Sequence, residues 1–306
     1  MKSKLFIFND GSGKAELVAQ YRERLSDSRM KELRLDRSID LAVEIARAVD
    51  EGCETIFAAG GDGTINAVVN AIMRLDEDRR PVLAIIPTGS ANDFATGTLH
   101  IPPDVDGVLD MIHDGEVTPM DVVEIRAAGF VRYFANVAAG GNSVRVSEQL
   151  SDDVKKKWGA LSYIRGSIGV INDLNSYHVI ADLDGERIEI DSWGLLVANG
   201  NTNAGGIMVA PKASPDDGLM DVILIRDGSA LDMVEIISKT LICSFLECEQ
   251  VVFRQVKRLE LRSEPAMRFT MDGEIFDEKP DQFTIIPDAV RMLIGRDWKP
   301  GAAIAK

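Results

Sequence analysis

Apolar residues in the first third of the chain follow two patterns in turn. Short continuous runs occur at residues 4–8 (KLFIF), 55–59 (TIFAA) and 81–86 (PVLAII), and each run is followed by a turn that contains glycine. After the first two turns, apolar residues recur at helical spacing, namely Leu17, Val18, Tyr21 and Leu25, then Ile65, Val68, Val69, Ile72 and Met73. Strand runs that alternate with helices predict an α/β domain with a parallel sheet covered by helices. Ligands of such sheets bind at the carboxyl ends of the strands, where the three turns would meet.

The pattern changes after about residue 120, where strand-like runs are joined by tight turns, several of them Asp-Gly. Helical spacing returns at about residues 153–174 and 231–245. These features predict a mainly antiparallel β second domain with a few helices. We place the first domain at residues 1–125 and the second at residues 126–286, and we expect residues 287–306 to return to the first domain.

The composition narrows the classes of partner and location. The chain has 306 residues, enough for two medium domains, and its net charge is −15. This acidity argues against a nucleic-acid partner, which needs a basic surface, and weakly against general adhesion to anionic membranes. No apolar run approaches the roughly 20 residues that span a bilayer, and the start turns polar too early for a signal peptide. The cysteines and histidines show no metal-binding spacing. We expect a cytoplasmic protein.

An aspartate stands inside the second glycine turn, residues 60–64 (GGDGT). The turn lacks the third glycine of the dinucleotide-binding fingerprint, and the first glycine turn does not complete a Walker A loop. A glycine turn before a helix, which we expect to begin at Thr64, still makes an anion site, because the backbone allows close approach and the helix start is partly positive. Asp62 fits such a site if Mg²⁺ joins its carboxylate to phosphates. The alternative is that Asp62 only caps the helix.

Six segments together resemble the diacylglycerol kinase catalytic domain family, in particular soluble bacterial lipid kinases related to diacylglycerol and sphingosine kinases. In the order that the family shows, they are residues 60–66 (GGDGTIN), 87–95 (PTGSANDFA), 136–141 (NVAAGG), 157–164 (KWGALSYI), 199–222 (NGNTNAGGIMVAPKASPDDGLMDV) and 271–274 (MDGE). GGDG alone is shared with NAD kinases and phosphofructokinases, so the combination carries the resemblance. It implies an α/β nucleotide-binding domain like that of NAD kinase and phosphofructokinase, a β-rich lipid-substrate domain, and a cleft between them.

The resemblance implies ATP as phosphoryl donor and Mg²⁺ as its metal. Three turns would bind the nucleotide, with Asp62 acting through Mg²⁺. Their residues are Asn9, Gly11, Ser12 and Gly13, then Gly60, Gly61, Asp62, Gly63, Thr64 and Asn66, then Ser90, Asn92 and Asp93. Asp10 departs from the family, which has proline at that position.

Acidic residues late in the chain correspond to two further sites of the family. The Asp217 carboxylate and the carbonyl oxygens of Ser214 and Leu219 would hold a structural Mg²⁺, which prefers oxygen ligands; an ordinary turn between strands is the alternative. Asp272 and Glu274 follow a predicted strand in which apolar residues occupy every second position. In the family, this acidic pair accepts the proton of the substrate hydroxyl. We favour Glu274 as the base and expect Asp272 and Asp62 to be catalytic. By itself, D-G-E is more often a hairpin turn.

The resemblance predicts an ATP- and Mg²⁺-dependent lipid kinase that transfers the γ-phosphoryl group to the hydroxyl of diacylglycerol or a similar lipid. For the basic run at residues 155–158 (KKKW), a solvated helix face is the favoured interpretation and contact with a lipid surface is the alternative. For the protein as a whole, we expect transient peripheral contact with the inner face of the membrane through its lipid substrate. A homo-oligomer is compatible with the sequence. Ala67 and Thr96 replace the Glu and Arg that the family often has, which bears on substrate preference or rate. Two other functions stay open: a kinase of a soluble metabolite, similar to NAD kinase, and a nucleotide-binding regulator with weakened catalysis.

Overall fold

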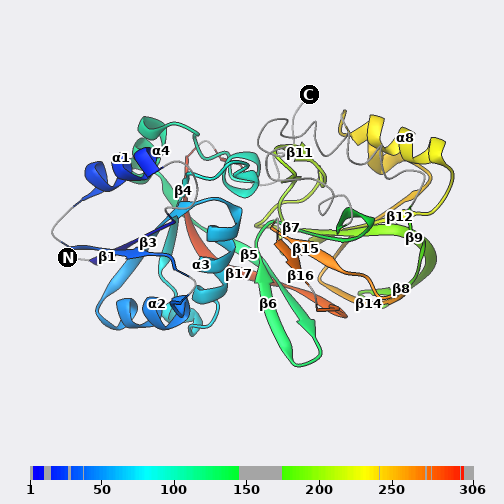
Figure 1. Cartoon of the computed structure of the whole chain (residues 1–306), viewed down its shortest axis with the longest axis horizontal. Helices are drawn as coiled ribbons and strands as arrows, with labels where there is room; N and C mark the ends of the chain where they lie inside the picture. The colour runs from blue at the N-terminus through cyan, green and yellow to red at the C-terminus, as the bar shows by residue number, and fades with distance from the viewer. Residues whose placement is uncertain are drawn as a thin grey trace.

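The computed structural model describes residues 3–9, 15–26, 29–36, 38–144, 174–240, 242–272, 274–276, 278–296 and 298–299. In Figure 1, helices α1 to α4 and strands β1 to β4 lie on one side, and strands β7 to β9 and β12 to β16 lie with helix α8 on the other. Strands β5, β6 and β17 run between the two parts. Within the described residues, no helix is both long and apolar enough to cross a membrane.

The first part contains a parallel sheet in the strand order β4-β3-β1-β2. Its strands are β1 (Ser3–Phe8), β2 (Met30–Arg34), β3 (Cys53–Gly60) and β4 (Val82–Pro87). The helices are α1 (Ala15–Leu25), α2 (Leu41–Asp50), α3 (Asp62–Ile72) and α4 (Val105–Asp114). The apolar runs of β1, β3 and β4 are almost wholly buried, as a sheet covered on both faces requires. The predicted α/β architecture is therefore confirmed.

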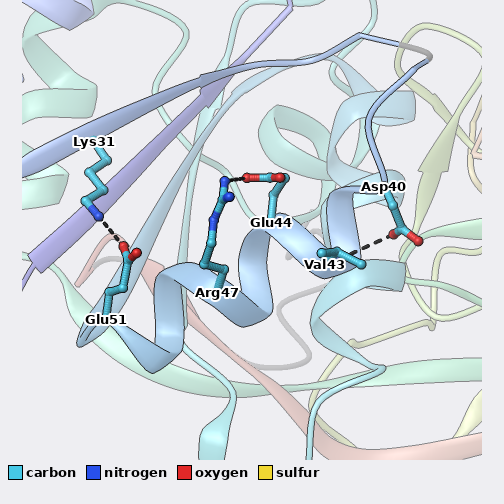
Figure 2. A network of polar contacts seen from close by, with 6 residues as sticks. All are labelled: Lys31, Asp40, Val43, Glu44, Arg47 and Glu51. Carbon is cyan, nitrogen blue, oxygen red and sulfur yellow. Dashed lines mark hydrogen bonds and ion pairs between the residues drawn. The ribbon is translucent and has the colours of Figure 1, made fainter.

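Helix α2 begins at a side-chain cap that lies on the surface. The Asp40 carboxylate accepts hydrogen bonds from the backbone N–H groups of Ala42 and Val43, at 3.1 and 3.4 Å, which satisfies donors that lack a partner within the helix. Figure 2 shows this cap beside two ion pairs, Glu44 with Arg47 and Lys31 with Glu51. Exposed pairs of this kind contribute about 0–1 kcal/mol, so the cap and the buried face fix the helix.

The second part is mainly antiparallel, as predicted. Its strands, together with the connecting ones, are β5 (Glu116–Ala127), β6 (Phe130–Phe134), β7 (Val137–Gly141), β8 (Tyr177–Leu183), β9 (Glu186–Ala198), β10 (Thr202–Asn203), β11 (Ile207–Met208), β12 (Met220–Arg226), β13 (Val251–Val256), β14 (Arg258–Glu264), β15 (Phe269–Met271), β16 (Glu274–Phe276) and β17 (Gln282–Ile294). The long strand β9 pairs with β7, β8 and β12, and all three pairings are antiparallel. A separate apolar core, which includes Phe269 and Phe283, fills this part.

The helical predictions in the second half have different outcomes. The stretch at residues 153–174 lies outside the described residues, except for Leu174. The predicted helix at residues 231–245 is shorter than expected, because α8 spans Ala230–Thr240 and a separate 3₁₀ turn follows at Phe245–Glu247. Cys243 has a φ of 56°, which is not helical, and the turn brings Phe245 into the core.

Strand β17 connects the two parts. Residues Gln282 to Thr284 pair with β14, and most of the strand pairs with β5. Near its end, Met292 and Leu293 pair in parallel with Leu83 and Ala84 of β4. The strand therefore passes from the antiparallel strands to the parallel ones, with an irregularity in its pairing with β5 between Ile286 and Val290.

Candidate active site

The turn at residues 60–64 joins β3 to α3. The helix begins at Asp62, two residues earlier than predicted, and Gly61 occupies the capping position without a side-chain hydrogen bond. The Asp62 carboxylate instead accepts the backbone N–H groups of Asp93 and Phe94, at 3.2 and 3.1 Å. The interpretation of Asp62 as a simple helix cap is therefore wrong, because its side chain connects two turns. Burial raises the pKa of Asp62, and the N–H donors of Phe94 and Asp93 oppose that rise.

The turns after β3 and β4 touch through their backbones. A Cβ added to Gly89 would lie 2.3 Å from the Cα of Gly61, so this approach requires glycine. Asn92 has a φ of 54° and shapes the second turn: its Oδ1 accepts the N–H of Gly89 at 2.9 Å, and its Nδ2 donates to the Gly89 carbonyl at 3.0 Å. Ser90 is exposed at this turn. The side chain of Asn92 thus organises the loop, whereas Ser90 faces solvent.

Asp93 begins a short π-helical segment, Asp93–Thr98, and binds the second domain. Its carboxylate accepts the backbone N–H groups of Gly205, at 3.0 Å, and Gly206, at 2.6 Å. The Thr202 hydroxyl donates to the Asp93 carbonyl at 2.8 Å. Burial, and then the nearby charge of Asp62, raise the pKa of Asp93 to about 6. The sequence segment that contains Gly205 and Gly206 is part of the family resemblance, but the local pattern gives no sign of this contact.

Asp272 lies between β15 and β16, in a left-handed conformation with a φ of 45°. Its Oδ2 accepts the side-chain N–H of Asn66 at 2.7 Å, and its Oδ1 accepts the backbone N–H of Val137 at 3.2 Å. Burial raises the pKa of Asp272 to about 7; the Asn66 hydrogen bond opposes the rise and the charge of Asp62 adds to it. The structure therefore brings Asp272 together with Asn66 and near Asp62.

The remaining predicted residues around this site are placed as follows. Gly60 ends β3, and Gly63 and Thr64 lie in the first turn of α3. Asn9 follows β1 at the same edge of the sheet, whereas Gly11, Ser12 and Gly13 lie outside the described residues. Glu274 is the first residue of β16 and pairs with Met271, and its side chain is outside the description.

The acidic turn before β12 contains the predicted metal residues. Leu219 N–H donates to Asp217 Oδ1 at 2.9 Å, and the Ser214 hydroxyl donates to Asp216 at 2.5 Å. Burial, and then the charges of Asp121 and Asp216, raise the pKa of Asp217. Mutual crowding of carboxylates is what a bound cation would relieve, so these residues fit Mg²⁺ chemically. Among the described residues, however, no group of three or more His, Cys, Asp or Glu side chains is arranged to hold a metal.

Two buried aspartates beside that turn were missed by the sequence reasoning. Asp121 of β5 accepts the backbone N–H of Gly218 at 2.7 Å and of Asp288 at 2.9 Å. Asp221 of β12 is 1% exposed, and its Oδ2 has no hydrogen-bond partner among the residues that the structure describes. Burial raises the pKa of Asp221 to about 7. A charged residue flanked by apolar neighbours, in the local sequence Met-Asp-Val, is the signal that marks both positions.

Two protein families together match nearly the whole chain. "Diacylglycerol kinase catalytic domain" matches residues 3–125, and "YegS C-terminal NAD kinase beta sandwich-like domain" matches residues 135–294, which is more than half of the chain. The chain belongs to the family of the YegS C-terminal NAD kinase beta sandwich-like domain, and its first part matches the diacylglycerol kinase catalytic domain. The first match ends at residue 125 and the second begins at residue 135, and the interval between them contains strand β6.

Relatives in this family carry the same kind of name. A diacylglycerol kinase of Staphylococcus aureus (strain MRSA252) is 28% identical over 291 residues, covering 92% of this chain and 89% of the relative. One from Staphylococcus saprophyticus is 27% identical over 260 residues, covering 85% and 83%. The solved structure of a diacylglycerol kinase from Bacillus anthracis str. Sterne has a TM-score of 0.76 at 22% identity, covering 96% and 98%, a likeness of fold. The family and these names support a kinase, which is a transferase.

Proposed function

We propose that this kinase is ATP- and Mg²⁺-dependent and phosphorylates the hydroxyl group of diacylglycerol or a similar lipid. The observation that carries the proposal is the hydrogen bond between Asn66, which follows the glycine turn, and Asp272 of the acidic pair. It joins the predicted phosphate-binding turn of one domain to the predicted proton acceptor in the other. The family resemblance at the same residues supports the choice of a lipid acceptor over a soluble one.

The ATP phosphates would bind at the glycine turn and the first turn of α3, because helix starts bind anions through backbone N–H groups and the helix dipole. Asp62 would meet the metal, and Asn9 and the loop that follows it would complete the nucleotide pocket. Mg²⁺ would neutralise charge on the transferred phosphoryl group. The raised pKa of Asp62 agrees with this role, because a nearby cation stabilises a carboxylate that burial destabilises.

The acidic pair would take the proton of the lipid hydroxyl. A group with a pKa near the working pH accepts and releases a proton readily, and the pKa of Asp272 is raised to about 7 by its burial. Glu274, which the resemblance favours as the base, stands two residues later at the start of the adjoining strand. The experiment described below distinguishes the roles of Asp272 and Glu274.

An apolar cavity offers a place for the lipid tail. It measures about 160 Å³ and is lined mainly by apolar groups of Gly140, Trp193, Leu195, Leu196, Ile225 and Met233. Gly140 belongs to β7, the strand whose Val137 contacts Asp272. Three residues of a strand span about 10 Å, so the cavity lies within reach of a lipid whose hydroxyl meets the acidic pair. We further propose that the enzyme works in the cytoplasm and meets the inner face of the membrane only peripherally and transiently.

The deciding experiment is transfer of radiolabelled γ-phosphate from ATP with Mg²⁺ to a panel of lipids in mixed micelles, with NAD and sugars as soluble acceptors. Wild type should label an organic-extractable product, and Asp62→Ala should abolish that label. Asp272→Asn and Glu274→Gln are compared for the larger loss of kcat, which identifies the base. Label in the soluble acceptors alone would instead favour a metabolite kinase, and ATP binding without any transfer would favour a regulator.

A further inference from the structure

Two asparagines one turn apart on α3 form a continuous hydrogen-bond network with β6 and Asp272. Asn70 Oδ1 accepts the backbone N–H of Tyr133 at 3.0 Å, and Asn70 Nδ2 donates to the Tyr133 carbonyl at 2.8 Å. The same Nδ2 also lies 3.0 Å from Asn66 Oδ1 and 2.9 Å from the backbone carbonyl oxygen of Asn66, so these two oxygens share one of its hydrogens. Asn66 Nδ2 then donates to Asp272 Oδ2, at 2.7 Å, and to the Tyr133 carbonyl, at 3.2 Å.

The direction of this network is fixed by the backbone of Tyr133. An asparagine amide can be turned end for end, but a backbone N–H can only donate. Asn70 must therefore present its oxygen to the Tyr133 N–H, which leaves its NH₂ group for Asn66. Asn66 accepts with its oxygen and so presents its own NH₂ group to Asp272. Each amide oxygen has a donor; the Asn66 NH₂ group has two acceptors, and the Asn70 NH₂ group has three, one of which is the Asn66 backbone carbonyl.

The consequence concerns how Asp272 is held. A donor at 2.7 Å stabilises a carboxylate, whereas a reversed Asn66 amide would face Asp272 with an oxygen and repel it. We propose that Asn70 is a positioning residue for phosphoryl transfer, which acts by fixing the Asn66 amide as a donor to Asp272. The proposal rests on the proposed function for its catalytic meaning, while the network itself is independent of that function.

Asn70→Asp tests the direction of the network, because a carboxylate has the shape of the amide but cannot donate to Asn66. We expect kcat to fall by about tenfold or more while KM for ATP stays within about twofold, because a misdirected acid or base group affects the chemical step. The matched control is Gln250→Glu, the same amide-to-acid change at a residue that bonds Asp232 away from this site. The control should keep kcat within about twofold of wild type.

A double-variant cycle decides whether Asn70 acts through Asn66. In an Asn66→Ala background, Asn70→Asp should cause no additional loss of kcat, because the group that it orients is already gone. Independent multiplicative losses in the two variants, or an equal loss in Gln250→Glu, would overturn the proposal.

A second measurement does not depend on enzyme activity. The free energies of unfolding of Asn66→Ala, Asn70→Ala and the double variant should be non-additive, and so should those of Asn66→Ala, Asp272→Asn and their double variant. Additive values would refute the network even if the enzyme transfers phosphate. If wild type transfers no phosphate to any lipid, the proposed function fails, and this cycle alone then judges the network.

Discussion

Asp62 and Asp272 are carboxylates that the fold buries near each other, away from the water that would otherwise stabilise their charges. Burial is the largest cause of the raised pKa of each residue, and the charge of Asp62 raises the pKa of Asp272 further. Backbone N–H groups offset part of this cost at Asp62, and Asn66 and Val137 do so at Asp272. Perturbed carboxylates in contact with a glycine turn are typical of catalytic sites, and a divalent cation would favour the charged form of both.

The raised pKa of Asp272 predicts how stability depends on pH. In the unfolded chain this carboxyl ionises near pH 3.8, but in the folded protein only near pH 7, so the folded state binds more protons between these values. The contribution of Asp272 to stability is therefore greatest below about pH 4 and declines as the pH rises to about 7. Since one pKa unit corresponds to about 1.4 kcal/mol, the total decline is of the order of a few kcal/mol.

Asp272→Asn should remove that decline. Chemical denaturation at several pH values should show a flatter profile for this variant than for wild type, with the largest difference above pH 7, where wild type carries the unfavourable charge. Asp76→Asn, at an exposed position, serves as the control and should follow wild type. Parallel profiles for wild type and Asp272→Asn would contradict the assignment of a raised pKa.

The π-helical segment that begins at Asp93 is the main polar link between the first domain and the loop at Gly205 and Gly206. The Asp93 carboxylate satisfies two backbone N–H groups of that loop. At the far end of the segment, the Thr98 hydroxyl accepts the backbone N–H of Asn201 at 3.1 Å, and its single hydrogen has the side-chain oxygens of Asn136 and Asn201 as acceptors. The segment Asp93–Thr98, which follows the turn after β4, thus holds the second domain through backbone N–H groups of that domain. Asp93, which we expected to contact the nucleotide, thus also forms hydrogen bonds from the first domain to the second.

Asp93→Ala should therefore destabilise the protein by about 2 kcal/mol or more, because it leaves two N–H groups in a part-buried site without an acceptor. The matched control is Ser90→Ala, an exposed change in the same turn, which should cost less than about 0.5 kcal/mol. Urea denaturation of the two variants gives the comparison. Equal stabilities would mean that the link between Asp93 and the glycine loop contributes nothing.

The local sequence predicted those elements in which buried and exposed positions follow a regular pattern of apolar and polar residues. Strands β1, β3 and β4 are continuous apolar runs, whereas β2 was missed because its sequence, MKELR, lies at the sheet edge and none of its residues is buried. Motifs indicated Asp62 and Asp272, but not that Asp62 bonds the second turn instead of capping its own helix. Asn70 and Asp121 act through partners far along the chain, and no local pattern records such contacts.

At the scale of the whole molecule, β17 joins the parallel and the antiparallel strands into one continuous hydrogen-bonded sheet. The strand pairs with β14 and β5 and ends in parallel pairing with β4, so neither part of the sheet is complete without it. Asn66, Asn70 and Asp93 add polar contacts across the same boundary. Domains that share a strand and a hydrogen-bonded site are expected to lose their structure together, unlike domains joined only by a linker.

Met292 is the residue at which that expectation can be measured. It is fully buried and pairs with Thr118 of β5 and Leu83 of β4. Met292→Ala should lower the free energy of unfolding by about 2–5 kcal/mol and the melting temperature by several degrees. The reason is that it leaves a cavity where the parallel and antiparallel strands meet. Val117→Ala, at a half-exposed position in β5, is the control and should have a much smaller effect. In calorimetry, wild type and Met292→Ala should each give one transition whose calorimetric and van't Hoff enthalpies agree. If wild type itself shows two transitions, β17 does not couple the domains, and the contacts around Asp272 would have to form after each domain has folded alone.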